Sequence, residues 1–430
     1  MFGLGRKKRM NPTEQRPLKK GAVPRTPSYI MAVSREGIGS REDWLERLRT
    51  SSLFQVVSYK AGDCLTVAVS YQGQDYEVDL FEEELELPEL FTINHQFSQE
   101  DFAVMKAARS GLTSAMRFHE DALASYLVQL RVLASLVPDM VGLVDFCGER
   151  ILSGVWARMA AQSEIPPSPR YLYSIQAVSG DDGQVWLHTH GLNRCGSIEL
   201  EILDSDREHY QDHAAVLQTV AGNVITKEPL GEEKELFWIS TLSGGQHLVG
   251  TWLDWPTAVR FYDKKLLGGA SDRDDGHNEN TGALFFYPSP EDYERKHFVP
   301  ISAYNELLAD NPIMMISTEE TERMRKLARE RLDWFRQEID REGVTGLMKF
   351  GLAADEEYQR EGSPNLEHIW FEVLSMEGDT VHCRCTQDAY YIGSLKEGVE
   401  LDLDIAQLTD WTLYLPERQV TPDTVYLLSV

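Results

Sequence analysis

Residues 53–81 read LFQVVSYKAGDCLTVAVSYQGQDYEVDLF, and this stretch predicts the kind of fold that the chain adopts. It contains three short runs rich in β-branched and aromatic residues, at 53–58, 64–71 and 76–81, separated by the turn sequences Ala-Gly-Asp and Gln-Gly-Gln-Asp. Such runs between turn signals are typical of antiparallel strands joined by tight turns. We therefore expect a small antiparallel meander here.

Helical patterns lie on both sides of this meander. Ahead of it, Ser40 is followed three residues later by Asp43, a pattern typical of the start of a helix. After it, helices are predicted over 98–110 and 117–137, and the second carries apolar side chains at intervals of three and four, typical of an amphipathic helix. Because strands and helices come in groups, the sequence predicts an α+β, multi-domain protein with antiparallel sheets packed against helices.

The length of 430 residues predicts about three domains, since a domain has roughly 150 residues. We expect a basic flexible tail over 1–29, an N-terminal α+β domain over 30–225, a middle β-rich region over 226–312 and a C-terminal domain over 313–430. Part of the middle region, ELFWISTLSGGQHLVGTW, aligns with EHIWFEVLSMEGDTVHCRC near the C-terminus with one gap. The middle region is therefore either a diverged copy of the C-terminal module or a similar hairpin that arose independently.

The C-terminal domain opens with the best-specified helix of the chain. Ser317-Thr-Glu-Glu320 matches a capping box, and apolar residues follow at helical spacing as far as Ile339. Short strand-like runs follow near 368–374, 380–386, 399–403 and 411–415. We expect a twisted antiparallel sheet packed on one long amphipathic helix.

The charge and composition exclude several classes of function. The chain holds 42 Lys+Arg against 69 Asp+Glu, a net charge of −27, which repels phosphate backbones and argues against general nucleic-acid binding. No apolar run approaches the roughly 18 residues that cross a bilayer, so membrane insertion is not expected. Five scattered cysteines indicate a reducing compartment, and the basic tail lacks the apolar segment of a secretory signal. We therefore expect a cytoplasmic protein.

The same charge favours a basic protein as partner, because opposite charges steer association. The sequence contains no phosphate-binding loop, no dinucleotide-binding glycine pattern and no GxSxG motif. We therefore expect a non-catalytic binding or accessory protein, one form of which is a protective, antitoxin-like role. No cofactor and no oligomeric state is predicted.

Four histidines form the most suggestive cluster in the sequence. His188 and His190 alternate along a predicted strand and share one face, and His209 and His213 are four residues apart on a predicted helix. A strand pair and a helix pair of this kind can supply the three or four ligands that zinc needs. The alternative function is therefore a metal-dependent hydrolase centred on the HTHGL segment. A metal-free binding site and purely structural histidines stay open, and we favour the last interpretation.

The residues around these histidines could extend such a site. Glu199 and Glu201 lie on the polar face of IELEI and could serve as a metal ligand or a general base. Gly191 predicts a turn that brings Arg194 and Cys195 near the histidines. An arginine beside Cys195 would lower the pKa of the thiol, which would make it a candidate nucleophile.

Two stretches resemble bacterial domains. EHIWFEV, MEGDTVHC and YYIGSLKEGVELDLDIAQLTDWTLY, in this order after the long helix, make the C-terminal region resemble the YegJ-like bacterial domain family, whose members have no established activity. The resemblance rests on Glu367, His368, Trp370, Gly398, Asp410 and Trp411. WLHTHGLNRCGSIELEIL, residues 186–203, resembles the signature of an uncharacterised bacterial domain that precedes the YegJ-like one. Neither resemblance implies a substrate.

Overall fold

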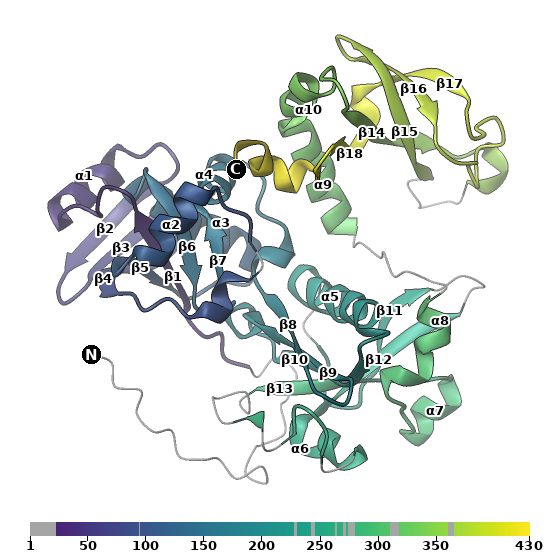
Figure 1. The fold of residues 1–430 in the computed structure, drawn as a ribbon, viewed down its shortest axis with the longest axis horizontal. Coiled ribbons are helices and arrows are strands. Elements are labelled where there is room, and N and C mark those ends of the chain that lie inside the picture. The colour runs from purple at the N-terminus through teal and green to yellow at the C-terminus, as the bar shows by residue number, and fades with distance from the viewer. Residues whose placement is uncertain are drawn as a thin grey trace.

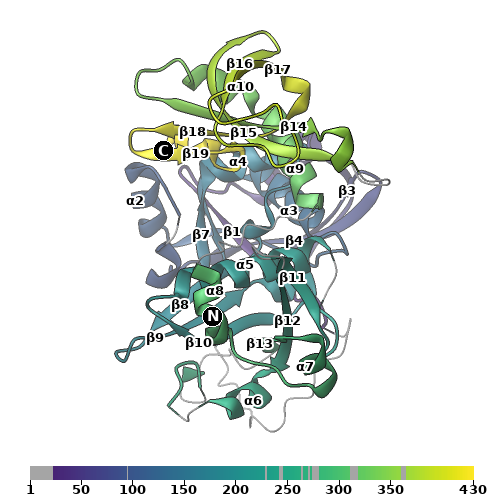
Figure 2. The same cartoon turned by 90° about the vertical axis from the view of Figure 1, so that its right-hand side faces the viewer.

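The computed structural model contains three β-sheets, each with its own helices, among the residues that it describes (Figures 1 and 2). These residues are 23–93, 95–227, 230–241, 246–262, 265–269, 272–273, 280–309, 318–359 and 365–430. The α+β class is therefore confirmed. Residues 1–22 of the expected basic tail and Ser317 of the expected capping box lie outside the described residues.

The first sheet has seven antiparallel strands and includes the predicted meander as β2, β3 and β4. Its order is β2 (Gln55–Ala61), β3 (Leu65–Tyr71), β4 (Gln74–Glu84), β5 (Ser110–Met116), β1 (Ser28–Ser34), β6 (Met140–Asp145) and β7 (Arg150–Ser153). Strand β1 is buried on both faces, because Ile30 and Ala32 pack into one apolar cluster and Met31 and Val33 into another. It therefore lacks the alternation of apolar and polar residues that is typical of a strand with one exposed face.

Helices cover both faces of this sheet. The helices α1 (Arg41–Thr50), α3 (Ala122–Leu136) and α4 (Gly154–Gln162) contribute to one apolar cluster, and α2 (Gln99–Ala107) contributes to the other. The predicted start of α1 is confirmed as a capping box. The Asp43 backbone N–H donates to the Ser40 hydroxyl at 3.3 Å, and the Ser40 backbone N–H donates to the Asp43 carboxylate at 2.8 Å.

The second sheet joins strands from both sides of the division that we expected at residue 225. Its order is β11 (Phe237–Thr241), β12 (His247–Asp254), β13 (Thr281–Phe286), β10 (Glu199–Asp206), β9 (Gln184–His190) and β8 (Ser174–Ser179). The strands β10 and β13 pair in parallel, which unites the two segments in one backbone ladder. Helix α5 (Tyr210–Thr226) covers one face and α6 (Trp255–Ala258) the other. A domain boundary at 225 would cut through this sheet.

The third sheet is antiparallel and packs on two helices where one long helix was expected. Its order is β17 (Glu400–Asp404), β16 (Thr380–Cys385), β15 (Leu366–Glu377), β14 (Thr345–Ala353), β18 (Leu408–Leu415) and β19 (Arg418–Val420). The helix is interrupted at Arg331, between α9 (Thr318–Glu330) and α10 (Leu332–Glu338).

The internal sequence echo does not correspond to equivalent positions in the second and third sheets. Strand β11 is an edge strand, whereas β15, with which it aligns, lies between β14 and β16. The two Asp-Trp pairs also differ, because Asp254 caps helix α6 while Asp410 and Trp411 lie inside β18.

The last turns of the chain attach the third domain to the first. The segment η11 (Pro422–Ser429) contacts α4 and α9, and Val425 and Leu427 belong to the same buried cluster as Tyr171 and Leu172 (Figure 1). Beside this contact, the Arg323 guanidinium donates to both carboxylate oxygens of Asp423, at 3.1 and 2.7 Å.

A buried ion pair joins the first and second domains. Arg194 lies in the short helix η4 (Leu192–Cys195), and Asp145 ends β6. Both side chains are 0% exposed, and two parallel hydrogen bonds of 2.8 Å connect the guanidinium to the carboxylate. The guanidinium also donates to the Leu172 carbonyl at 3.0 Å and to the Ser28 hydroxyl at 3.2 Å. Arg194 therefore fixes η4 against the first sheet.

None of the described helices combines the length and apolar composition that crossing a bilayer requires.

Replacing Arg194 with Gln should lower the free energy of unfolding by about 3–5 kcal/mol, because the buried Asp145 carboxylate would lose both 2.8 Å hydrogen bonds from a cation and keep only the Arg150 cation, whose Nε lies 3.7 Å away. Urea unfolding followed by tryptophan fluorescence measures the loss. Arg35→Gln is the control, since Arg35 pairs with Glu100 and Asp101 at the surface and its loss should cost less than about 1 kcal/mol. Equal losses in the two variants would contradict the structural role of Arg194.

Candidate functional site

Two cavities adjoin where the first and second domains meet, and the third domain also borders the larger one. The larger has a volume of about 690 Å³ and is called the cleft below; the smaller, of about 230 Å³, is called the pocket. Glu149, in the turn between β6 and β7, lines both. Its carboxylate accepts a hydrogen bond of 2.9 Å from the Gln176 amide in the cleft and lies 3.3 Å from His190 Nδ1 in the pocket.

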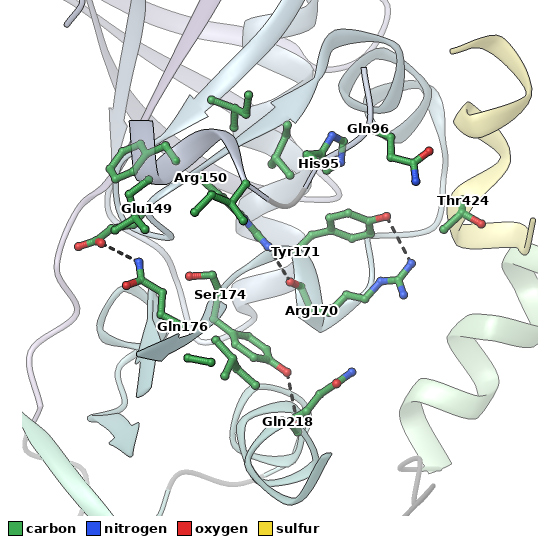
Figure 3. Close-up of a pocket in the computed structure, with 18 of the residues that line it drawn as sticks. His95, Gln96, Glu149, Arg150, Arg170, Tyr171, Ser174, Gln176, Gln218 and Thr424 are labelled. Atoms are coloured by element: carbon green, nitrogen blue, oxygen red, sulfur yellow. Dashed lines mark hydrogen bonds between the residues drawn. The ribbon is translucent and has the colours of Figure 1, made fainter. Parts of the chain in front are cut away.

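All three domains contribute to the cleft (Figure 3). The first domain supplies His95 and Arg150 near β7, the second supplies β8 and Gln218 of α5, and the third supplies Thr424, Tyr426 and Leu427 of η11. The cleft therefore exists only when the three domains are packed together.

Arg150 is the central charged group of the cleft. Its Nη1 donates to the Arg170 carbonyl at 3.1 Å, and its Nε lies 3.7 Å from an Asp145 carboxylate oxygen that Arg194 already binds. The Nε and Nη2 atoms are buried, and no described residue accepts a hydrogen bond from either. The buried Ser174 hydroxyl also has no hydrogen-bond partner among the described residues. Buried polar atoms of this kind are usually satisfied, so the cleft offers donors for a further group.

Aromatic rings also line the cleft. The His95 ring stacks on Tyr426 with ring centres 5.2 Å apart, and its Nδ1 accepts from the Ser153 backbone N–H at 2.9 Å. Burial, helped by the charges of Arg150 and Arg170, lowers the pKa of His95 to about 3. Burial raises the pKa of Tyr426. At neutral pH these rings are therefore uncharged.

The predicted strand pair of histidines lies in the pocket. His188 and His190 both line it from β9, and the His188 ring stacks on Trp186 with ring centres 4.0 Å apart. His190 lies at the boundary with the cleft, facing Glu149.

The predicted helix pair lies elsewhere, so the four histidines do not converge. His209 Nδ1 lies 2.9 Å from Asp206, at the start of α5. His213 Nδ1 lies 2.8 Å from the Ser205 hydroxyl and its Nε2 lies 2.9 Å from the Asn305 side-chain oxygen. Neither residue lines the pocket, and burial lowers the pKa of His213. Within the described part of the chain, no three His, Cys, Asp or Glu side chains are grouped so that they could hold a metal ion.

The two predicted glutamates are buried and line the pocket. Glu199 accepts from the Thr189 hydroxyl at 2.7 Å, the Gly191 N–H at 2.9 Å and the Asn193 N–H at 3.1 Å. It thereby holds the turn that Gly191 enters with a left-handed φ of 114°. Glu201 accepts from the Trp186 indole at 2.9 Å and from the Arg273 guanidinium. Both carboxylates are thus parts of buried hydrogen-bond networks.

Cys195 is not placed as a nucleophile. It does not line the pocket, and burial raises the pKa of its thiol to about 12, although Arg194 acts in the opposite direction. The sequence suggested an activated thiol because Arg194 is its neighbour. In the structure the Arg194 charge is directed to Asp145, and the thiol is desolvated.

The residues that carry the C-terminal resemblance hold its sheet together, and none of them lines the cleft or the pocket. Glu367 accepts from the backbone N–H groups of Tyr390 and Tyr391 at 2.7 and 2.8 Å, and the Trp411 indole donates to the Ala328 carbonyl of α9 at 2.9 Å. The remaining residues also make contacts within this domain. Hydrogen bonds join His368 with Thr409, Gly398 with Cys385, and Asp410 with the Trp411 N–H, and the Lys349 ammonium lies over the Trp370 ring.

Sequence reasoning did not identify the polar groups of the cleft, Arg150, Arg170 and Ser174. Each is an isolated residue with no motif around it. The left-handed φ of 49° at the neighbouring Glu149 is visible only in the structure, so the sequence offered no signal for these residues.

Asp410→Asn should stabilise the protein at about pH 8 by about 1–3 kcal/mol and change its stability little at about pH 4.5. Burial raises the pKa of Asp410 to about 7. The folded state therefore keeps a proton that the unfolded chain releases near pH 4, so stability falls as the pH rises between these values. Urea unfolding at the two pH values measures the effect.

The control for this measurement is Asp333→Asn, because Asp333 is exposed. A stabilisation by Asp410→Asn of the same size at both pH values would contradict the assignment.

Comparison with known families divides the chain as the three sheets do. Residues 28–167 match the family model described as protein of unknown function (DUF4026) N-terminal, and residues 175–285 match protein of unknown function (DUF4026) C-terminal. Residues 319–428 match uncharacterized protein conserved in bacteria (DUF2314). No curated protein and no solved structure matches the chain. The expectation of bacterial domains without an assigned function is confirmed: the chain carries the N-terminal and C-terminal domains of DUF4026, followed by a DUF2314 domain.

Proposed function

We propose that this protein is a non-catalytic binding protein whose cleft takes a small organic anion, a carboxylate or phosphate attached to an apolar group. The observation that carries the proposal is the state of Arg150. Its Nε and Nη2 are buried in a cleft of about 690 Å³, and no described residue accepts from them. A guanidinium offers paired donors that match the geometry of carboxylate and phosphate oxygens.

The charge around the cleft supports an anion. Arg150 and Arg170 both line it, and Glu149 is the one carboxylate among the described lining residues. Glu149 is engaged by the Gln176 amide and faces away toward His190. The cleft thus carries two guanidinium groups although the chain has a net charge of −27. A cleft lined by positive charges raises the local concentration of anionic ligands.

The remaining lining supports an apolar part in the ligand. Tyr171, Tyr173 and Tyr426 contribute rings, and Ile151, Leu152 and Leu427 contribute aliphatic side chains. A mostly apolar cavity with a few placed polar groups is typical of small-molecule sites, and the volume lies within their usual range.

Binding is favoured over acid–base catalysis by the protonation states of the lining rings. A general acid or base works best when its pKa lies near the working pH. His95 has a pKa of about 3, and burial raises the pKa values of Tyr171, Tyr173 and Tyr426. We do not extend the proposal to a metal-dependent hydrolase, because the histidines that it requires lie in two separate places.

An accessory role follows from the position of the cleft. A ligand there would contact all three domains, and a ligand that binds only the packed arrangement stabilises that arrangement. We infer that the third domain is of the YegJ-like kind. Its segment η11 lines the cleft, so we infer that the third domain takes part in this stabilisation through η11. A basic protein partner, an antitoxin-like role and a cytoplasmic location stay predictions that rest on the charge and the cysteine pattern.

Calorimetric titration with benzoate and phenyl phosphate tests the cleft, with benzyl alcohol and benzylammonium as neutral and cationic comparators. We expect the anions to bind and to raise Tm. Arg150→Gln should weaken their binding about tenfold or more, because it removes a charged donor. Arg109→Gln is the matched control, since Arg109 is exposed and away from the cleft; it should leave binding unchanged.

Two outcomes would overturn the proposal: binding of benzyl alcohol as tightly as benzoate, or equal anion affinity in Arg150→Gln and the unmodified protein. Ser174→Ala provides a second, smaller change in the same cleft. It should weaken binding by a smaller factor while the circular dichroism spectrum stays unchanged.

A further inference from the structure

We propose that the cleft binds the C-terminal segment of a partner protein as an extended strand. The segment adds to the free edge of β8 and places its terminal carboxylate on Arg150. This inference rests on the anion site proposed above and states what the anion belongs to. Three features of the cleft support it: a sheet edge along it, two donors at the start of that edge, and exposed apolar side chains in its lining.

Strand β8 is an edge strand, and its edge borders the cleft. It lies at the end of the second sheet, where β9 is its one partner strand among the described residues. The five consecutive residues 174–178 all line the cleft. Successive side chains of a strand point to opposite faces of its sheet. An unbroken run of lining residues therefore indicates that the cleft borders the edge of β8 and not one of its faces.

The outer edge of β8 has backbone groups that a further strand could pair with. In an antiparallel pair, every second residue directs its N–H and C=O groups away from the partner strand. No described residue outside β9 makes a hydrogen bond with the backbone of residues 174–179. Such an edge is a template for an added strand, and strand addition is a common way to bind extended peptides.

Strand β7 is the edge strand of the first sheet and also lines the cleft, with Arg150, Ile151 and Leu152. Its outer edge is less available, because the Ser153 backbone N–H already donates to His95 Nδ1 at 2.9 Å. It is also shorter, with four residues against the six of β8. We therefore assign the added strand to β8.

The unsatisfied donors of the cleft set the direction of the ligand. Ser174, whose buried hydroxyl has no partner among the described residues, is the first residue of β8 (Figure 3). Arg150 donates through Nη1 to the carbonyl of Arg170, just before β8, and its Nε and Nη2 stay available. A carboxylate can accept from a guanidinium and a hydroxyl together. A strand whose C-terminus lies at the start of β8 runs antiparallel to it, which is the more frequent pairing.

Exposed apolar side chains in the lining indicate that the ligand extends beyond its carboxylate. Leu90 is 51% exposed, Ile93 65% and Val178 38%, and all three line the cleft. Exposed apolar side chains that gather at a groove are typical of a surface that a partner covers. The six residues of β8 span roughly 20 Å, since a strand rises about 3.3 Å per residue. A peptide can follow this edge, whereas a small acid occupies only one end of it.

Fluorescence polarisation with the full chain and the peptide Thr-Val-Thr-Val-Leu, labelled at its amino end, tests the inference. We expect the peptide acid to bind about tenfold or more tightly than the competitor acetyl-leucine, because backbone and apolar contacts add to the carboxylate contact. The same peptide with a C-terminal amide should bind about tenfold more weakly than the acid. Arg150→Gln should remove most of this difference between acid and amide.

Two N-methylated forms of the peptide test the backbone pairing. Methylation of alternate peptide nitrogens removes the N–H groups on one side of an extended strand, and the pattern shifted by one residue removes those on the other side. Only one side pairs with β8, so one form should bind far more weakly than the other. Equal affinity of the two forms would overturn the pairing.

Val178→Ser should weaken binding of the peptide acid about three- to tenfold, because it removes apolar contact area on β8. The matched control is Val57→Ser. Val57 is a 54% exposed valine on β2, which is also an edge strand but does not line the cleft. Val57→Ser should leave binding unchanged, and equal effects of the two substitutions would contradict the inference.

The outcomes distinguish this inference from the anion site on which it rests. Benzoate binding that depends on Arg150, together with a peptide acid that binds no more tightly than acetyl-leucine, would overturn the added strand alone. A peptide amide that binds as tightly as the acid would also overturn the inference, because the terminal carboxylate would not be recognised. If neither benzoate nor the peptide acid binds, both proposals are overturned.

Discussion

The buried pair of Arg194 and Asp145 sets the geometry of both cavities. Asp145 precedes the turn that carries Glu149 and leads to Arg150, the first residue of β7. Arg194 lies in the turn after His190, which Glu199 holds by hydrogen bonds. Burying two charges is costly unless their remaining hydrogen bonds are satisfied. Here the guanidinium also reaches the Leu172 carbonyl and the Ser28 hydroxyl, and it lies 5.3 Å from the Tyr126 ring centre. The pair therefore aligns two sheets with a directional contact that apolar packing alone does not provide.

Local sequence patterns predicted the elements whose signals are contained within a few residues. The meander β2–β4 and the capping box at Ser40 both have turn or cap residues beside a regular pattern of apolar side chains. The sequence did not predict β1 as a central strand, because both of its faces are buried. The predicted domain boundary at 225 falls inside the second sheet. The sequence did not reveal this, because the pairing of β10 with β13 links segments far apart in the chain and leaves no local signature.

The candidate site was predicted only in part, for a similar reason. His188, His190, Glu199 and Glu201 were identified because they lie close together in sequence, and they do line one pocket. His209 and His213 were grouped with them on spacing alone, and the structure directs them to Asp206, Ser205 and Asn305. Arg150 and Ser174 come from different domains, so their proximity depends on how the domains pack. The spacing of apolar residues along the sequence does not predict such packing.

The parallel pairing of β10 with β13 has a consequence for how the chain is made. On the ribosome, β8, β9 and β10 emerge well before β13, so one side of β10 stays without its neighbour while the intervening residues are synthesised. An exposed strand edge is a template for wrong pairing, and distant contacts form slowly. The nascent second domain should therefore be the part of this protein that most needs a chaperone, whereas the meander of the first domain can form as soon as it leaves the exit tunnel.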